Sequence, residues 1–481
     1  MRPLIINPAT EDRYELGPMQ QGMLFDTLQS ESPDVYCMLV AYTLRGPLDR
    51  SAFRAAWQHI VARHAILRTS FEWHEHREPS QIVHADAALE VQDHDWSGEG
   101  ASDQDERLRA LLRAESRRGF DLRQPPLMRL CLIRCAPDLH RLVIAQHHIL
   151  MDGSCKPLLF REAFTCYDAL RSGHAPQLPP ARPYRDYIEW VREQDITAAE
   201  AYWHAELADF AEPTPLWADG LAAAASDEEY QQHESLLGEV GTEALRLTAR
   251  RSRLTLNTML TGIWALQLAH AGRRDDVVVG TTVNGRPPLA GVDTMLGLFI
   301  NTLPLRVRVS PDMAMSTWLR TIQISLATAR DYDFTPLWRI QRCSAIPRGR
   351  PLFESIVVFE NNPGYGSDDH ERYGDVAITA VQPFTRNSLP LTLRGVPGRN
   401  LAIQLLYDTR RFSSETIHRA ADQMTDALRE LADGIDQPVR HYLGRFQQLI
   451  EQREADAAST YHTRRADMLR RLKRDGRTRN L

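Results

Sequence analysis

Residues 142–153 contain a pattern that could carry acid–base chemistry: the adjacent histidines His147 and His148, followed by Asp152 and Gly153. A histidine side chain has an unperturbed pKa of about 6.5, so it can take up or release a proton near neutral pH. The apolar residues before the pair predict a strand, along which side chains alternate. We therefore expect one histidine to face a reaction chamber and the other to pack behind it. Gly153 should allow a sharp turn whose backbone N–H can be approached closely.

Other interpretations of these residues have less support. A histidine in an apolar strand is commonly a satisfied core residue, but the complete HHxxxDG pattern is rare by chance and favours a functional motif. Adjacent strand residues point apart, so His147 and His148 cannot chelate one metal ion, and we predict no metal site. The sequence has no GxSxG motif of a serine hydrolase. Its six cysteines are scattered without a CxxC pair, which argues against a zinc site and a disulfide framework.

The composition limits the class of protein. The chain has 481 residues, of which 43% are hydrophobic and 25% are charged, with a net charge of −6. This is typical of a soluble globular protein, long enough for two domains because single cores stop growing at about 250–300 residues. The charge gives no overall basic field for nucleic acid. No run approaches the ~18 apolar residues of a membrane span, and the first 15 residues lack a signal-peptide core, so we predict a cytoplasmic protein that binds neither membrane nor nucleic acid.

Strand-like and helical segments alternate along the chain and predict a mixed α/β protein. Predicted strands lie at residues 36–44, 127–133, 142–145, 277–282, 305–309, 356–359 and 401–406. Predicted helices lie at residues 105–117, 158–171, 198–207, 242–251, 257–271, 315–330 and 414–434. A Pro-rich connector at 174–183 suggests a first lobe at 1–190 that carries HHxxxDG, a second lobe at 191–440 and a helical basic tail at 441–481. We expect an exposed loop at 218–229.

Several other segments carry a resemblance to a known family. Leu16–Leu24 and Arg63–Phe71 look like its first two motifs, and HHxxxDG is its third. Further matches in the family's order lie at Tyr184–Trp190, Gly280–Pro287, Leu296–Thr302 and, more loosely, Arg330–Phe334 and Arg350–Glu354. On these segments the chain resembles the condensation domains of nonribosomal peptide synthetases, within the chloramphenicol-acetyltransferase-like acyltransferases.

The resemblance implies a fold and a set of partners. The fold would be an α+β sandwich of two acetyltransferase-like lobes, arranged as a V-shaped pseudo-dimer with a central tunnel and HHxxxDG in the middle. Carrier proteins would dock at both mouths and present substrates on phosphopantetheine arms, so no tightly bound cofactor is expected. We expect a monomer.

The resemblance also implies a reaction and roles for the motif residues. The family transfers an acyl group from a carrier-bound thioester to an amine or, in some members, to an alcohol. Resemblance assigns the proton-transfer or orienting role to His148. His147 should support the site by packing or hydrogen bonding. Asp152 should pair with Arg286 across the lobe junction, although a second base is an alternative, and the Gly153 N–H is a candidate contact for the thioester or oxyanion.

Three further residues are candidates for the tunnel lining. Ser154 stands where the family often has an aromatic residue, which puts the usual shape of the acceptor side in doubt. Asn301 and Asn361 could line the tunnel, but structural hydrogen bonding is an equal alternative. The donor, the acceptor and the choice between amide and ester formation are not fixed by the sequence.

Four functions compete on this fold. The first is a free-standing condensation enzyme for natural-product biosynthesis, because no adenylation or carrier segment is apparent in the sequence. The second is an acyltransferase that uses a soluble donor such as an acyl-CoA. The third is a non-catalytic domain that recruits other enzymes to carrier proteins, against which the intact HHxxxDG argues. The fourth is an epimerisation domain, which would normally lie beside a carrier in a synthetase.

Overall fold

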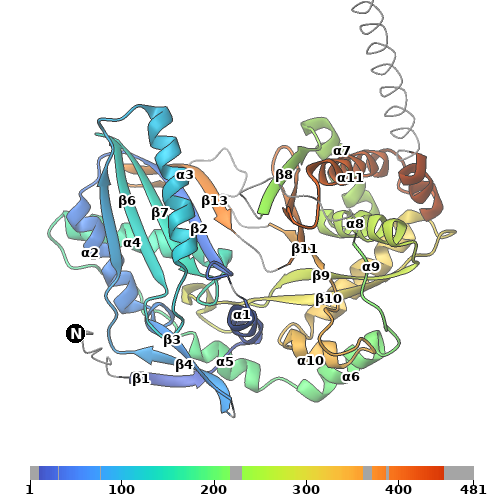
Figure 1. The fold of residues 1–481 in the computed structure, drawn as a ribbon, viewed down its shortest axis with the longest axis horizontal. Helices are drawn as coiled ribbons and strands as arrows, with labels where there is room; N and C mark the ends of the chain where they lie inside the picture. The colour runs from blue at the N-terminus through green and yellow to red at the C-terminus, as the bar shows by residue number, and fades with distance from the viewer. Residues whose placement is uncertain are drawn as a thin grey trace, which may run out of the picture.

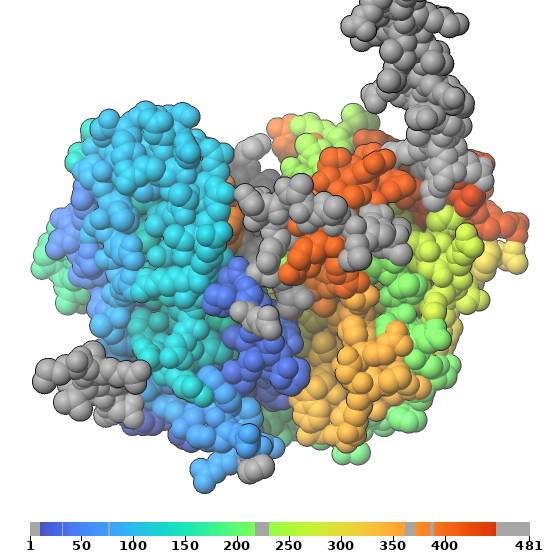
Figure 2. Space-filling model, viewed as in Figure 1, coloured from blue at the N-terminus to red at the C-terminus, as the bar shows by residue number. Residues whose placement is uncertain are grey.

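The computed structural model describes residues 10–30, 32–75, 77–216, 230–360, 371–385 and 389–448. The predicted loop at 218–229, Asn361 and residues 449–481 of the predicted tail lie outside these ranges. Two lobes lie side by side, the first coloured blue to cyan and the second green to red, and they meet in the lower half of the view (Figure 2).

A six-stranded sheet forms the first lobe and carries the two histidines at the end of a central strand. Its strand order is β12-β13-β2-β7-β6-β5. The strands are β2 (Cys37–Arg45), β5 (Glu90–Asp95), β6 (Met128–Ala136), β7 (Leu139–His147), β12 (Glu371–Tyr373) and β13 (Val376–Thr385). Strand β7 lies between β2 and β6 and is buried along most of its length, as its apolar sequence predicts.

Helices cover both faces of this sheet. Helices α2 (Arg50–Arg63) and α4 (Lys156–Arg171) pack on one face in a large apolar core, and α3 (Ala101–Arg118) covers the other face in a smaller one. Helix α2 is capped at its N-terminus by Asp49, whose carboxylate accepts hydrogen bonds from the backbone N–H groups of Ser51 and Ala52. A small sheet of order β1-β4-β3, formed by β1 (Thr10–Glu15), β3 (Thr69–His74) and β4 (Arg77–His84), extends the lobe.

The second lobe is built on another six-stranded sheet, of order β10-β9-β11-β14-β15-β8. Its strands are β8 (Tyr230–Leu236), β9 (Asp276–Asn284), β10 (Ile300–Arg308), β11 (Ser355–Phe359), β14 (Leu391–Val396) and β15 (Ala402–Asp408). One face packs on α7 (Glu239–Ser252), α8 (Leu256–Gly272), α9 (Met315–Arg330) and α11 (Ser414–Gly434), and the other on α6 (Ile196–Leu207) and α10 (Leu337–Arg342). Helix α8 is buried almost all round, which explains its mostly apolar sequence.

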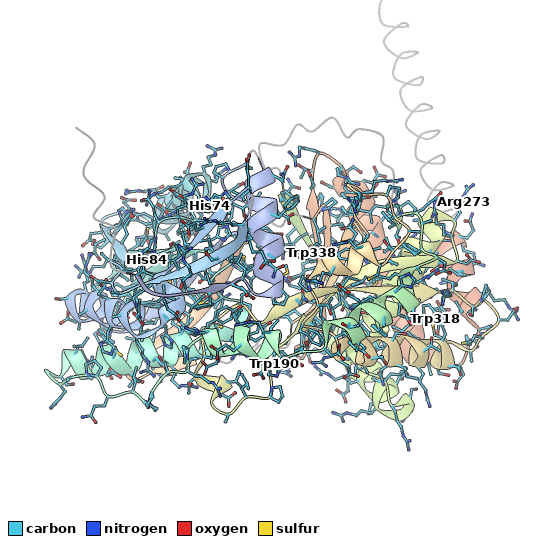
Figure 3. The ribbon with its side chains drawn as sticks, turned by 90° about the horizontal axis from the view of Figure 1, so that it is seen from below. His74, His84, Trp190, Arg273, Trp318 and Trp338 are labelled. Carbon is cyan, nitrogen blue, oxygen red and sulfur yellow. The ribbon has the colours of Figure 1, made fainter. Side chains whose placement is uncertain are left out.

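The lobes exchange elements. Strand β13 from the second half of the chain pairs along nearly all of β2, so residues 371–385 belong to the first sheet (Figure 1). Residues Met295–Phe299, just before β10, pack in the core of the first lobe. Helix α1 (Pro18–Gln29) meets α10 of the second lobe, where the Trp338 indole donates a hydrogen bond of 2.8 Å to Gln21 (Figure 3). The lobe boundaries predicted at residues 190 and 440 stay predictions, and the exchange of β12 and β13 was not foreseen.

No helix in the described ranges has both the length and the hydropathy that a membrane crossing requires. Helix α5 (Arg185–Arg192) connects the lobes and follows the Pro-rich segment.

Candidate functional site

The two histidines leave strand β7 in opposite directions, as strand alternation predicts. His147 is the last residue of β7 and is 1% exposed. His148 is partly exposed, and its ring faces a cavity between the sheet and the start of α4. The His148 backbone N–H donates to the carbonyl of Tyr36 at 2.8 Å, which anchors the histidine to the residue before β2. The structure therefore places His148, and not His147, where a substrate could reach it.

The surroundings of His148 determine which ring nitrogen carries the proton. Its Nδ1 lies 3.1 Å from the carbonyl of Met151, and a carbonyl oxygen only accepts, so Nδ1 carries the hydrogen. In the neutral ring, Nε2 is then the acceptor. Burial lowers the His148 pKa below its ordinary value, opposed by the negative charge of Asp152 and the hydrogen bond to Met151. At neutral pH the imidazole is uncharged, and it can accept a proton at Nε2.

The His147 ring is held by hydrogen bonds at both of its nitrogens. Its Nδ1 accepts a hydrogen bond of 3.2 Å from the backbone N–H of Ile149. Its Nε2 lies 3.4 Å from the Thr27 hydroxyl, which itself donates to the carbonyl of Met23, so Nε2–H donates to Thr27. Burial, with a smaller contribution from His148, lowers the His147 pKa to about 3. Both ring nitrogens are occupied, so His147 supports the turn and does not exchange protons with a substrate.

Asp152 ties the histidine turn to the second half of the chain. One carboxylate oxygen accepts from the Ser154 N–H at 2.9 Å and from the Ser154 hydroxyl at 2.5 Å. The other accepts from the backbone N–H groups of Phe299 at 2.7 Å and Ile300 at 3.1 Å. The side chain is 2% exposed, so these four donors replace its water. Asp152 thus acts as a clamp between the turn and the residues before β10.

The predicted direct ion pair between Asp152 and Arg286 is wrong. The structure describes both side chains, and no ion pair within 4 Å joins them. The Arg286 guanidinium donates to the Ser154 hydroxyl at 3.2 Å and to the carbonyl of Val292 at 2.9 Å, and it lies 4.2 Å above the Phe299 ring. The physical reason is that Ser154 stands between the two charges. Its hydroxyl donates to Asp152 and accepts from Arg286, and this forms a relay across the lobe junction.

The other predicted lining residues have different positions. Gly153 lines the cavity beside His148, at the start of a 3-10 turn (Gly153–Cys155). Ser154 is outside the lining and serves the relay. Of the two alternatives for Asn301, the structure shows structural hydrogen bonding, because the residue is 2% exposed and its amide donates to the carbonyls of Asp333 at 2.7 Å and Thr335 at 2.8 Å. Asn361 lies outside the described residues.

A small cavity adjoins the His148 ring, with a volume of about 30 Å³. Its lining comprises Met38, Val40, Tyr42, Ile144, Gln146, His148, Met151, Asp152, Gly153, Lys156 and Leu159. Sequence reasoning missed the side chains that β2, β7 and α4 contribute to this set. The signal for the strand residues is the period-two spacing of 38, 40 and 42 in β2, and of 144 and 146 in β7 with 148 directly after it.

Two more supporting contacts come from segments that the motifs marked. The Gln20 amide, 0% exposed, donates to the carbonyl of Ile149 at 3.0 Å and so braces the histidine turn from α1. The Tyr184 hydroxyl donates to the carbonyl of Leu298 at 2.7 Å. Its ring lies so close to Gly297 that a Cβ there would be 2.0 Å from it, so only glycine fits. In the described ranges no three His, Cys, Asp or Glu side chains gather as metal ligands would.

Comparisons with known proteins show the family to which the chain is similar. The family model described as "Condensation domain" matches residues 10–448. One component of the linear gramicidin synthase of Brevibacillus parabrevis is 39% identical over 429 residues, which cover 88% of this chain and 6% of that protein. The chondramide synthase of Chondromyces crocatus is 34% identical over 408 residues, 84% of this chain and 10% of that protein. The chain thus spans only a small part of the curated relatives it matches.

Solved structures show the same fold. A variant of the starter condensation domain of rhizomide synthetase, in complex with C8-CoA, matches with a TM-score of 0.75 at 22% identity, over 89% of this chain and 96% of that one. The X-domain from teicoplanin biosynthesis matches with a TM-score of 0.76 at 22% identity, over 90% and 97%. These matches confirm the predicted α+β fold of two lobes.

Proposed function

Because this chain belongs to the condensation-domain family, we propose that it transfers an acyl or peptidyl group from a carrier-bound phosphopantetheine thioester to an amine or a hydroxyl. Condensation domains generally catalyse amide bond formation and work with carrier proteins. The observation that carries the proposal is the neutral imidazole of His148, which faces the cavity with Nε2 as an acceptor.

The chemistry needs one proton acceptor at the reacting atoms. The acceptor nitrogen or oxygen attacks the thioester carbonyl, and His148 Nε2 takes the proton that the nucleophile loses. The new C–N or C–O bond forms as the C–S bond breaks, and the imidazolium returns the proton to the leaving thiolate. General base catalysis of this kind contributes about 10²–10⁴-fold. Asp152 and His147 hold the turn that positions His148 and do not touch the reacting atoms.

The carrier as partner, the biosynthesis of a natural product as setting and the cytoplasm as location belong to this proposal. So do action as a separate enzyme and the monomeric state. An acyl-CoA donor is the main alternative, supported by the C8-CoA bound to one structural neighbour. A recruiting role is the other, because the teicoplanin X-domain matches equally well and is also known in complex with OxyB.

One assay separates these functions. A carrier protein loaded with acyl-phosphopantetheine is mixed with the chain and an amine or alcohol acceptor, and the mass of the carrier is followed. We expect deacylation together with formation of the amide or ester. A recruiting domain leaves the carrier unchanged, an epimerisation domain alters stereochemistry without altering mass, and a CoA-dependent enzyme works without any carrier.

The decisive variant is His148→Ala. Turnover should fall by about 10²–10⁴-fold, because the base is lost. The exposed His59 on α2 provides a matched control, and His59→Ala should retain full activity. Circular dichroism and thermal unfolding check that both variants are folded. Full activity of His148→Ala would remove the basis of the proposal.

A further inference from the structure

We propose that the cavity beside His148 selects a short, uncharged aliphatic substituent of about one or two carbon atoms on one of the two substrates. This inference rests on the proposed function and names the substrate class of the same site. It depends on the walls of the cavity, on its size and on the balance of charge in its lining.

The walls come from secondary structure that cannot shift independently. Met38, Val40 and Tyr42 occupy alternate positions of β2 and so face the same side of the sheet. Across the ladder, Val40 pairs with Ile144 on β7. Leu159, 2% exposed, closes the space from α4. The cavity therefore reaches from the imidazole into the interior of the first lobe, between the sheet and a helix.

The size of the cavity limits what can enter. A cavity needs at least ~10–15 Å³ of such volume to hold a single water molecule, so about 30 Å³ leaves room only for a small group of about one or two carbon atoms. Tyr42 is 4% exposed and stands edge-on to Phe160, with ring centroids 4.7 Å apart. Phe160 in turn stacks on Tyr373 of β12 at 6.4 Å. Tyr42 cannot turn aside without disturbing the exchanged hairpin, whereas Met38 is partly exposed and flexible.

The lining favours an uncharged guest. The Gln146 amide donates to the carbonyl of Met151 at 3.5 Å, and the Asp152 carboxylate already accepts four hydrogen bonds. Lys156 brings a positive charge and Asp152 a negative one, and the two act on His148 in opposite directions. A charged or strongly polar substituent would give up its water for a lining whose charges cancel, which is unfavourable.

The substituent has two possible sources, the chain of the acyl donor or the side chain of the acceptor. The shared chemistry is a short alkyl group next to the reacting carbonyl or nucleophile. One arm of the experiment varies the donor from acetyl through propionyl and butyryl to octanoyl, with glycine amide as acceptor. The other arm keeps the acetyl donor and varies the acceptor through the amides of glycine, alanine, valine and leucine. A succinyl donor and aspartate amide test the exclusion of charge.

We expect kcat/KM in one arm to fall by about 10–200-fold for each methylene beyond the limit, as measured in other size-selective pockets. Met38→Ala should move the limit to longer chains by two or three carbon atoms. Met313→Ala is the matched control, because Met313 is also partly buried but packs on the core of the second lobe. It should leave the profile unchanged.

Equal rates along both arms, an unchanged profile in Met38→Ala, or a preference for the succinyl or aspartyl substrate would overturn the size and charge filter. The arm that shows the cut-off identifies the source. The filter and the proposed function can fail separately. If no transfer occurs, titration calorimetry with unreactive acyl-aminopantetheine amides of the same lengths, and separately with the four acceptor amides, still measures the filter, and uniform or absent binding in both series contradicts it.

Discussion

His147 and His148 are neighbours in sequence and opposites in surroundings. Behind the sheet, His147 is buried with both ring nitrogens hydrogen-bonded. In front of it, His148 uses one nitrogen for structure and presents the other to a cavity of about 30 Å³. The period of a β-strand separates the two roles, because successive side chains must take opposite faces. His147 thus stabilises the turn, and His148 on the same turn can border a cavity.

The largest expected change in stability comes from releasing the turn that both histidines share. Asp152→Ala removes the acceptor of two backbone N–H groups, the buried one of Phe299 and the partly buried one of Ile300. Each unsatisfied donor costs about 1–3 kcal/mol, so the free energy of unfolding should fall by about 4 kcal/mol. Denaturant unfolding measures this value. Asp138→Ala, at an exposed turn, should change it by less than about 0.5 kcal/mol, and equal effects of the two variants would contradict the clamp.

A crossed pair of variants sharpens the comparison directly. His147→Ala removes a fully buried ring and should lower the free energy of unfolding by about 2–4 kcal/mol, as in other core truncations. His148→Ala should cost less than about 1 kcal/mol, because His148 is partly exposed and its ring adjoins a cavity instead of being packed on all sides. Turnover per folded molecule should show the reverse order, with the greater loss in His148→Ala. Stability is measured by denaturant unfolding and turnover by the carrier assay. If both readouts rank the variants alike, the division of roles is wrong.

Much of this arrangement could be predicted from sequence because it depends on local patterns. Alternation along residues 142–148 placed the histidines correctly, and the amphipathic run at 414–434 matches α11, which begins after the Ser413 cap. The pairing of β13 with β2 could not be predicted, because it joins residues more than 330 positions apart and no pattern in the sequence of β13 indicates which strand it pairs with. Condensation-type motifs marked the right segments without giving their hydrogen bonds.

The assignments that the sequence left wrong or open share a physical reason. The resemblance implied a direct pair of Asp152 and Arg286, but the Ser154 hydroxyl lies between them, and its position depends on angles that the sequence does not contain. For Asn301 the sequence leaves tunnel lining and structural hydrogen bonding open, because only the tertiary structure brings the carbonyls of Asp333 and Thr335 to its amide. Polar residues near a site are thus located by sequence more readily than their partners are.

The smallest expected effect is on the pH dependence of stability, to which His147 and His148 each contribute. Burial lowers the His147 pKa to about 3, so this residue is neutral in the folded chain while its unfolded form takes up a proton below about 6.5. The stability that follows from this difference is complete above the unfolded pKa and is lost as the pH falls. Between pH 7.5 and pH 5.5 the loss is about 1.4 kcal/mol for one such group. His148 adds a loss in the same direction, because its folded pKa is also lowered.

We therefore expect His147→Gln to lose about 1.4 kcal/mol less than the unaltered chain over this interval, measured by denaturant unfolding at the two pH values. Activity per folded molecule should still fall in this variant as the pH is lowered. His148 must be neutral to accept a proton, and its titration is retained. His59→Gln, at an exposed position, should leave the pH dependence of stability unchanged. If His147→Gln also flattened the pH profile of turnover, the assignment of proton transfer to His148 would be wrong.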